Sequence, residues 1–180
     1  MRDPVAELER LRRVEHLRPA DLAAIDRLFR AGLLADLAQV DWLATEVLGA
    51  VLVRTKRRAE LARGLAAWRD AESAWQRRAA CLALAELAAG GDAVLPGLCA
   101  LALGVCAVVV WSPDRLDQTA VARLLRELSR AEPARVEAWF RRWARLMSRE
   151  GARAAVARLP AARRQELLAH HRRATTLRRR

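Results

Sequence analysis

The chain has no tyrosine, only two phenylalanines and a single lysine among its 180 residues. Side chains that favour strands are also scarce, with β-branched residues gathered only at 108–110, which argues against an all-β or α/β fold. Cys81, Cys99 and Cys106 lie among apolar neighbours, and their odd number argues against a disulfide framework and for a reducing compartment. None of them stands at metal-ligand spacing to a histidine, so we expect no metal site.

The chain also lacks an uninterrupted apolar run of membrane-spanning length. Its most apolar segment, 93–111, is interrupted by Pro96, Gly97 and Gly104, which favours a buried core helix over a membrane span. The N terminus continues into a charged helix and not into an apolar signal region. We therefore expect a cytoplasmic protein without membrane contact.

Arginine is what the chain has in excess. The 33 basic and 21 acidic residues give a net charge of +12. Residues 1–112 carry 15 basic and 14 acidic groups, whereas residues 113–180 carry 18 and 7. A general bias toward arginine would raise its frequency everywhere without segregating it. A folded domain with one nearly neutral part and one strongly cationic part indicates a polyanionic partner.

Helical periodicity runs through the whole chain, and prolines stand where helices could begin. The expected helices cover residues 4–17, 19–31, 33–55, 57–69, 72–89, 93–110, 114–131, 133–147, 149–159 and 161–177. The length of the chain predicts a single domain, which we assign to residues 1–170, followed by a basic C-terminal tail at 171–180. We expect this domain to be a monomer.

Internal similarity indicates a repeat architecture. The run Ala-Val-Ala-Arg-Leu at 120–124 recurs at 155–159, which is 35 residues later. A looser match pairs residues 79–87 with residues 120–128 at an offset of 41. Such spacings are typical of the helix pairs in HEAT and armadillo arrays. The predicted fold is therefore an all-α, HEAT-like or armadillo-like helical repeat solenoid (an α-α superhelix) with a concave face.

Two series of mostly basic side chains follow helical spacing in the cationic part. The first lies on one edge of the helix expected at 114–131 and consists of Arg115, Thr119, Arg123, Arg126 and Arg130. The second steps by four residues, across a helix break predicted near Ser148, and consists of Arg141, Arg145, Arg149 and Arg153. Guanidinium rows suit bidentate phosphate contacts and predict a surface that follows a nucleic-acid backbone.

Trp42 and Glu46 stand four residues apart, on one face of an expected helix. An indole beside a carboxylate can stack on a cationic group and stabilise its charge.

Several segments resemble the DNA alkylation repair family, the HEAT-like alkylpurine DNA glycosylases. The matching segments are the tryptophan–arginine run 68–80, the run 117–128 of the following repeat, its continuation at 148–150, and 42–46, where the family has Trp-Asp-x-x-Asp. The resemblance covers about residues 20–170. It identifies a divergent member whose N-terminal part is shorter than usual by about one helix pair.

This resemblance implies a concave cationic face that binds damaged double-stranded DNA and excises N3- or N7-alkylated purines without base flipping. It implies that Trp42 lies against the sugar of the damaged nucleotide and that Glu46 takes the place of the catalytic aspartate. The expected DNA contacts, from the resemblance and from the two rows, are Arg78, Arg123, Arg126, Arg130, Arg149 and Arg153. No cofactor is expected. A cationic alkylated base is a good leaving group by itself, so the resemblance implies that little general acid is needed.

Two departures from the family pattern keep alternatives open. Glu46 replaces an aspartate, and Ala122-Arg123 stands where catalytic members have Gly-Trp. Arg123 would oppose a positively charged transition state if it faced the site. The first hypothesis is a monofunctional alkylpurine DNA glycosylase that hydrolyses the N-glycosidic bond. The second is a noncatalytic DNA-structure-binding protein of the same family, and the third is a helical-repeat scaffold that binds acidic proteins.

Overall fold

The computed structural model describes residues 17–176, and every regular element within them is helical. The elements in chain order are α2 (Pro19–Arg30), α3 (Leu37–Trp42), η1 (Leu43–Gly49), α4 (Ala50–Arg54), α5 (Arg58–Ala66), η2 (Ala67–Asp70), α6 (Ala74–Ala88), α7 (Gly91–Val94), α8 (Leu98–Val109), α9 (Arg115–Leu128), α10 (Pro133–Trp143), η3 (Ala144–Leu146), α11 (Arg149–Ala155) and α12 (Ala161–Thr176). The predicted all-α fold is confirmed. The helix expected at 4–17 lies outside the described residues, apart from Leu17.

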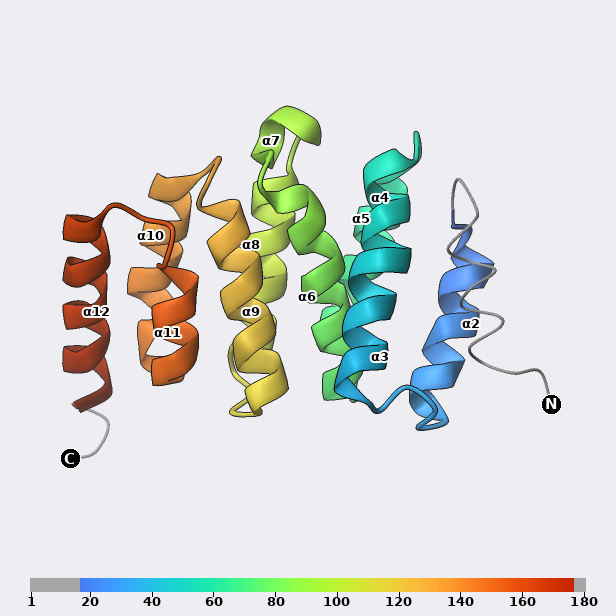
Figure 1. The fold of residues 1–180 in the computed structure, drawn as a ribbon, viewed down its shortest axis with the longest axis horizontal. Helices are drawn as coiled ribbons and strands as arrows, with labels where there is room; N and C mark the ends of the chain where they lie inside the picture. The colour runs from blue at the N-terminus through green and yellow to red at the C-terminus, as the bar shows by residue number, and fades with distance from the viewer. Residues whose placement is uncertain (1–16, 177–180) are drawn as a thin grey trace.

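The helices stand side by side in a row that runs from α2 at one end to α12 at the other (Figure 1). α6 packs on η1 and α4 on one side and on α9 on the other, and α9 packs on α11. We call α3, η1, α4, α6, α9 and α11 the front layer. Behind it, α8 contacts α5 and α10, and α8 also packs against α6 and α9. Because each helix packs on its counterpart in the next repeat, the predicted helical repeat solenoid is confirmed.

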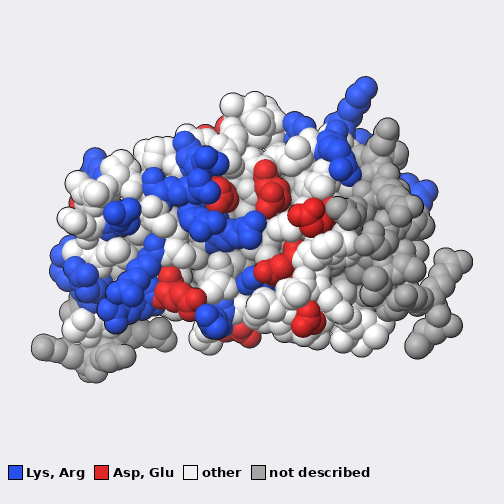
Figure 2. Space-filling view, viewed as in Figure 1, with Lys and Arg blue, Asp and Glu red and all other residues white. Residues whose placement is uncertain are grey.

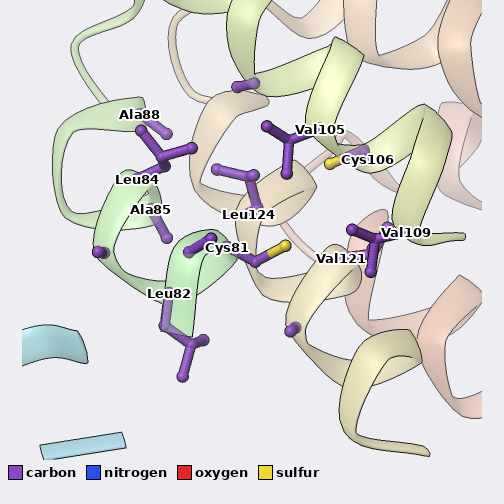
Figure 3. Close-up of a cluster of buried hydrophobic side chains, with 14 of the residues drawn as sticks. Cys81, Leu82, Leu84, Ala85, Ala88, Val105, Cys106, Val109, Val121 and Leu124 are labelled. Carbon is purple, nitrogen blue, oxygen red and sulfur yellow. The ribbon is translucent and has the colours of Figure 1, made fainter. Parts of the chain in front are cut away.

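The hydrophobic core lies between these two layers. Leu84 of α6, Val105 of α8 and Leu124 of α9 point toward one another beside the thiols of Cys81 and Cys106 (Figure 3), and all five side chains are buried. Burial raises the pKa of the Cys81 thiol to about 12 and the pKa of the Cys106 thiol well above its ordinary range. Both thiols are therefore neutral at physiological pH and inert as nucleophiles.

The apolar segment forms two helices, so the single helix predicted over 93–110 is wrong. α7 ends at Val94, before Pro96, which has no amide hydrogen to donate to a helix. Gly97 caps α8 with a φ of +83°, a left-handed conformation that glycine adopts without strain. α8 then lies in the core as expected. Among the described residues, no helix is both long enough and apolar enough to span a membrane.

Side-chain caps set where the front-layer helices begin. Asp36, Asp114 and Ser148 each accept a backbone N–H bond in the first turn of α3, α9 and α11, respectively. The cap at Ser148 confirms the break predicted there. At the C-terminal end, α12 continues to Thr176, and His171 within it is buried with its Nε2 atom 3.0 Å from the Met147 carbonyl oxygen.

Candidate nucleic-acid interface

Trp42 and Glu46 lie where the first front-layer helix changes its geometry. η1 is π-helical, and the amide of Ala50 at its end donates to the carbonyl of Thr45, five residues earlier. The hydroxyl of Thr45 donates to the carbonyl of Asp41 at 2.9 Å, which supports the wider turn. Trp42 is half-buried against the core, whereas Glu46 is exposed. Short π-helical turns are frequent at functional sites, and this one includes Glu46.

Arg78 is buried at the centre of the front layer. Its Nε and Nη2 atoms donate to the two carboxylate oxygens of Asp41 at 2.6 and 2.8 Å. Its Nη1 atom donates to the hydroxyl of Thr119 at 2.9 Å and to the carbonyl of Leu116 at 3.3 Å. Only 8% of Arg78 is exposed. The side chain therefore joins α3 to α9 across α6, and its guanidinium is held in place by protein groups.

The preceding residue, Arg77, makes a second cross-link between α6 and α9. Its Nε donates to a carboxylate oxygen of Asp117 at 3.2 Å, and its Nη2 donates to the same carboxylate. Its Nη1 donates to the carbonyls of Ala71 and Glu72 at 2.7 and 2.8 Å. Asp117 is fully buried. A buried carboxylate needs such a partner, because an unpaired buried charge is strongly destabilising.

Glu86, Gly49 and Arg123 form a third contact across the same elements. The Nη2 atom of Arg123 donates to Oε1 of Glu86 at 3.1 Å, and 40% and 35% of the two side chains, respectively, are exposed. Glu86 also lies against η1, because a Cβ added to Gly49 would stand 2.6 Å from the Cγ of Glu86. The predicted DNA contact Arg123 is thus paired with a carboxylate beside the element that carries Glu46.

The three arginine–carboxylate pairs join positions that stand about one repeat apart. Arg78 is 37 residues from Asp41, and Arg123 is 37 residues from Glu86. The Arg77–Asp117 pair spans 40 residues. Sequence reasoning missed the three carboxylates as partners. Their spacing was the available signal, because each stands about one repeat away from an arginine.

The first predicted row of basic residues lies along α9, with much of its charge paired. Arg115 is bonded to Glu150 of α11, and this guanidinium lowers the pKa of the Glu150 carboxyl. Arg126 contacts Glu127 at 3.1 Å, and its side chain is 38% exposed. Arg130 lies beyond the end of α9, is exposed, and has no ion pair within residues 17–176.

The second predicted row does not form one helix face, because Ser148 starts a new helix within it. Arg141 lies on α10 and pairs with Glu166, whose carboxyl pKa it lowers, and Arg145 lies in η3. Arg149 and Arg153 lie on α11 and are exposed. Neither has an ion pair in the part of the chain that the structure describes.

Figure 2 shows the front layer from outside. Basic side chains gather over the end formed by α9, α11 and α12, and acidic side chains lie among them and toward the middle of the face. In the described part of the front layer, the basic excess after residue 112 is therefore exposed at the surface. Within residues 17–176, no group of three or more His, Cys, Asp or Glu side chains is placed to hold a metal ion.

Comparison with known proteins gives one family. The model of the family described as DNA alkylation repair enzyme matches residues 8–159. This range includes Trp42, Glu46 and each of the predicted DNA contacts. Among curated proteins and solved structures, none matched the chain.

Proposed function

This chain belongs to the DNA alkylation repair enzyme family, and from that premise we propose that it binds damaged duplex DNA along the front layer and releases N3- or N7-alkylated purines. The bond that breaks is the N-glycosidic bond, and the base is not flipped out of the duplex. The observation that carries the proposal is the place of Glu46, an exposed carboxylate in a π-helical turn that follows the half-buried Trp42. Arg78 of α6 forms an ion pair with Asp41 of α3, the helix that precedes this turn.

The chemistry requires stabilisation of one developing charge. An N3- or N7-alkylated purine is cationic, so the bond from C1′ to the base breaks with its electron pair moving to the base, which leaves neutral. C1′ becomes positively charged together with the ring oxygen, and a water adds there and loses a proton. A carboxylate beside the sugar stabilises that charge and accepts the proton. We assign this role to Glu46, and to Trp42 an electron-rich ring against the sugar.

The DNA backbone is held at the cationic end of the layer. Arg130, Arg149 and Arg153 are exposed without ion pairs among residues 17–176, so phosphate contacts would break no ion pair within that part of the chain. Arg126, which stands four residues before Arg130, is partly exposed. The predicted contacts Arg78 and Arg123 are each paired with a carboxylate, Asp41 and Glu86 respectively, so neither pair adds net positive charge to the layer.

A second function is binding of damaged or branched DNA without excision. One observation favours it: Arg123 stands on the front layer where the resemblance leads us to expect a tryptophan. A cation at that place opposes a transition state that is itself positive.

Incubation with a duplex that carries one N7-methylguanine distinguishes the two functions. With protein in excess, we expect free N7-methylguanine and an abasic site to form faster than in a protein-free control, and no base release from the unmodified duplex. Chromatography of the released base measures this. Binding of the lesion-bearing duplex without base release would contradict excision and support the noncatalytic function.

A further inference from the structure

We propose that Glu86 neutralises the positive charge of Arg123 on the face that carries Glu46, and that Arg123 pairs with this carboxylate and does not bind a phosphate. The inference rests on the proposed function, since it assigns Glu86 and Arg123 to the surroundings of Glu46. Sequence reasoning placed Arg123 among the DNA contacts and gave Glu86 no role.

Close approach of two helices places Glu86. A Cβ on Gly49 would stand 2.6 Å from Cγ and 3.1 Å from Cβ of Glu86, and 3.0 Å from the carbonyl oxygen of Ala44. Gly49 has an ordinary helical φ of −64°, so lack of space and not backbone conformation requires glycine. Gly49 follows Glu46 by three residues on η1. The Glu86 side chain therefore lies against the same element as Glu46, about one turn further along.

The surroundings of Arg123 limit what it can bind. Its Nε atom is buried and has no hydrogen-bond partner, and its Nη2 atom donates to Glu86. The side of a guanidinium that offers Nε and Nη2 together is a bidentate fork for phosphate. In Arg123 the protein buries the Nε atom, and the Nη2 atom already donates to Glu86, so this pair of donors is not open to a phosphate. Arg123 is thus placed to hold a carboxylate.

The pairing also removes the objection that Arg123 raises against excision. An isolated guanidinium near the sugar would repel the positive charge that develops at C1′. With Glu86 at 3.1 Å, the pair adds no net positive charge to the face on which Glu46 lies. Within residues 17–176, Glu86 has no other ion pair or hydrogen bond, so Arg123 alone fixes its carboxylate. Glu86 is accordingly a charge-compensating residue, and its effect on the rate depends on the presence of Arg123.

The excision arm of the test compares Glu86→Gln, Arg123→Gln and the double variant, using protein in excess over duplex with one N7-methylguanine. Glu86→Gln leaves the cation uncompensated, and we expect base release to slow by about tenfold, the effect of a modest rise in the barrier. Arg123→Gln removes the cation itself and should leave the rate within about threefold of wild type, as should the double variant. A merely structural ion pair predicts that all three variants lose rate and thermal stability together, and that result would overturn the inference.

The affinity arm does not depend on catalysis. Duplex affinity is measured against salt concentration, with Arg149→Gln plus Arg153→Gln as the reference that should lower the salt slope by about two. Arg123→Gln should leave the affinity and the slope unchanged. A slope lowered by about one in Arg123→Gln would make Arg123 a phosphate ligand and overturn the inference. If the wild type releases no base, the proposed function fails, and this arm alone decides the assignment of Arg123.

Discussion

Glu46→Gln is expected to slow release of N7-methylguanine at least about a hundredfold while duplex affinity stays unchanged. The substitution keeps the shape of the side chain and removes its negative charge. The charge that develops at C1′ then loses its nearest proposed counter-charge, and the attacking water loses its proton acceptor. Glu46 is exposed, so water can solvate the amide that replaces its carboxylate. Single-turnover release of the base, measured beside duplex affinity, separates the chemical step from binding.

Glu60→Gln is the matched control for this variant. Glu60 lies on α5, behind the front layer, and pairs with Arg57 at 2.6 Å. Its neutralisation changes net charge by the same amount, so release and affinity should both match the wild type. Base release by Glu46→Gln at the wild-type rate would show that Glu46 is not the stabilising carboxylate.

Asp117→Ala is expected to lower the free energy of unfolding by about 3–5 kcal/mol, because it leaves the mostly buried guanidinium of Arg77 without its counter-charge. For a chain of this size the loss corresponds to a fall in Tm of about 10 °C. Only 16% of the Arg77 side chain is exposed, so water cannot replace the lost carboxylate. Denaturant titration and thermal melting both measure the change.

Glu150→Ala provides the comparison on the surface. Glu150 also accepts from an arginine of the neighbouring front-layer helix, but 81% of the Arg115 side chain and 56% of the Glu150 side chain are exposed. Water can solvate Arg115 after the substitution, so the unfolding midpoint should not move. Equal losses in Asp117→Ala and Glu150→Ala would contradict the view that burial sets the strength of these inter-repeat pairs.

The sequence predicted the helices well where local chemistry starts or stops them. Pro19 and Pro133 each occupy the first turn of a helix, and Ser148 ends one predicted segment and begins another. The prediction was wrong over 93–110, where apolar composition outweighed the breaking effect of Pro96 and Gly97. The π-helical turn at Glu46 was not predicted either, because a seven-residue change in helical pitch hardly alters the pattern of apolar residues.

The candidate site was predictable only in part. Helical spacing singled out Trp42 and Glu46 and the family resemblance gave them roles, but the use of each arginine depends on partners from other repeats. Arg77 and Arg78 are adjacent in sequence, yet one pairs with α9 and the other with α3. The row on α9 looks like unpaired charge in the sequence, because Arg115 and Arg123 have partners that stand 35 and 37 residues away. Ion pairing across repeats is a tertiary property that helical spacing does not encode.

The central claim is that the front layer faces DNA with position 46 beside the damaged nucleotide, and disulfide cross-linking tests it most directly. Glu46→Cys is mixed with a duplex whose nucleotide at the lesion position carries a tethered thiol, and Arg63→Cys on α5 serves as the control. The native thiols are all buried, so the introduced cysteine reacts alone. We predict rapid cross-linking of Glu46→Cys and none of Arg63→Cys. Cross-linking of Arg63→Cys without that of Glu46→Cys would contradict the claim.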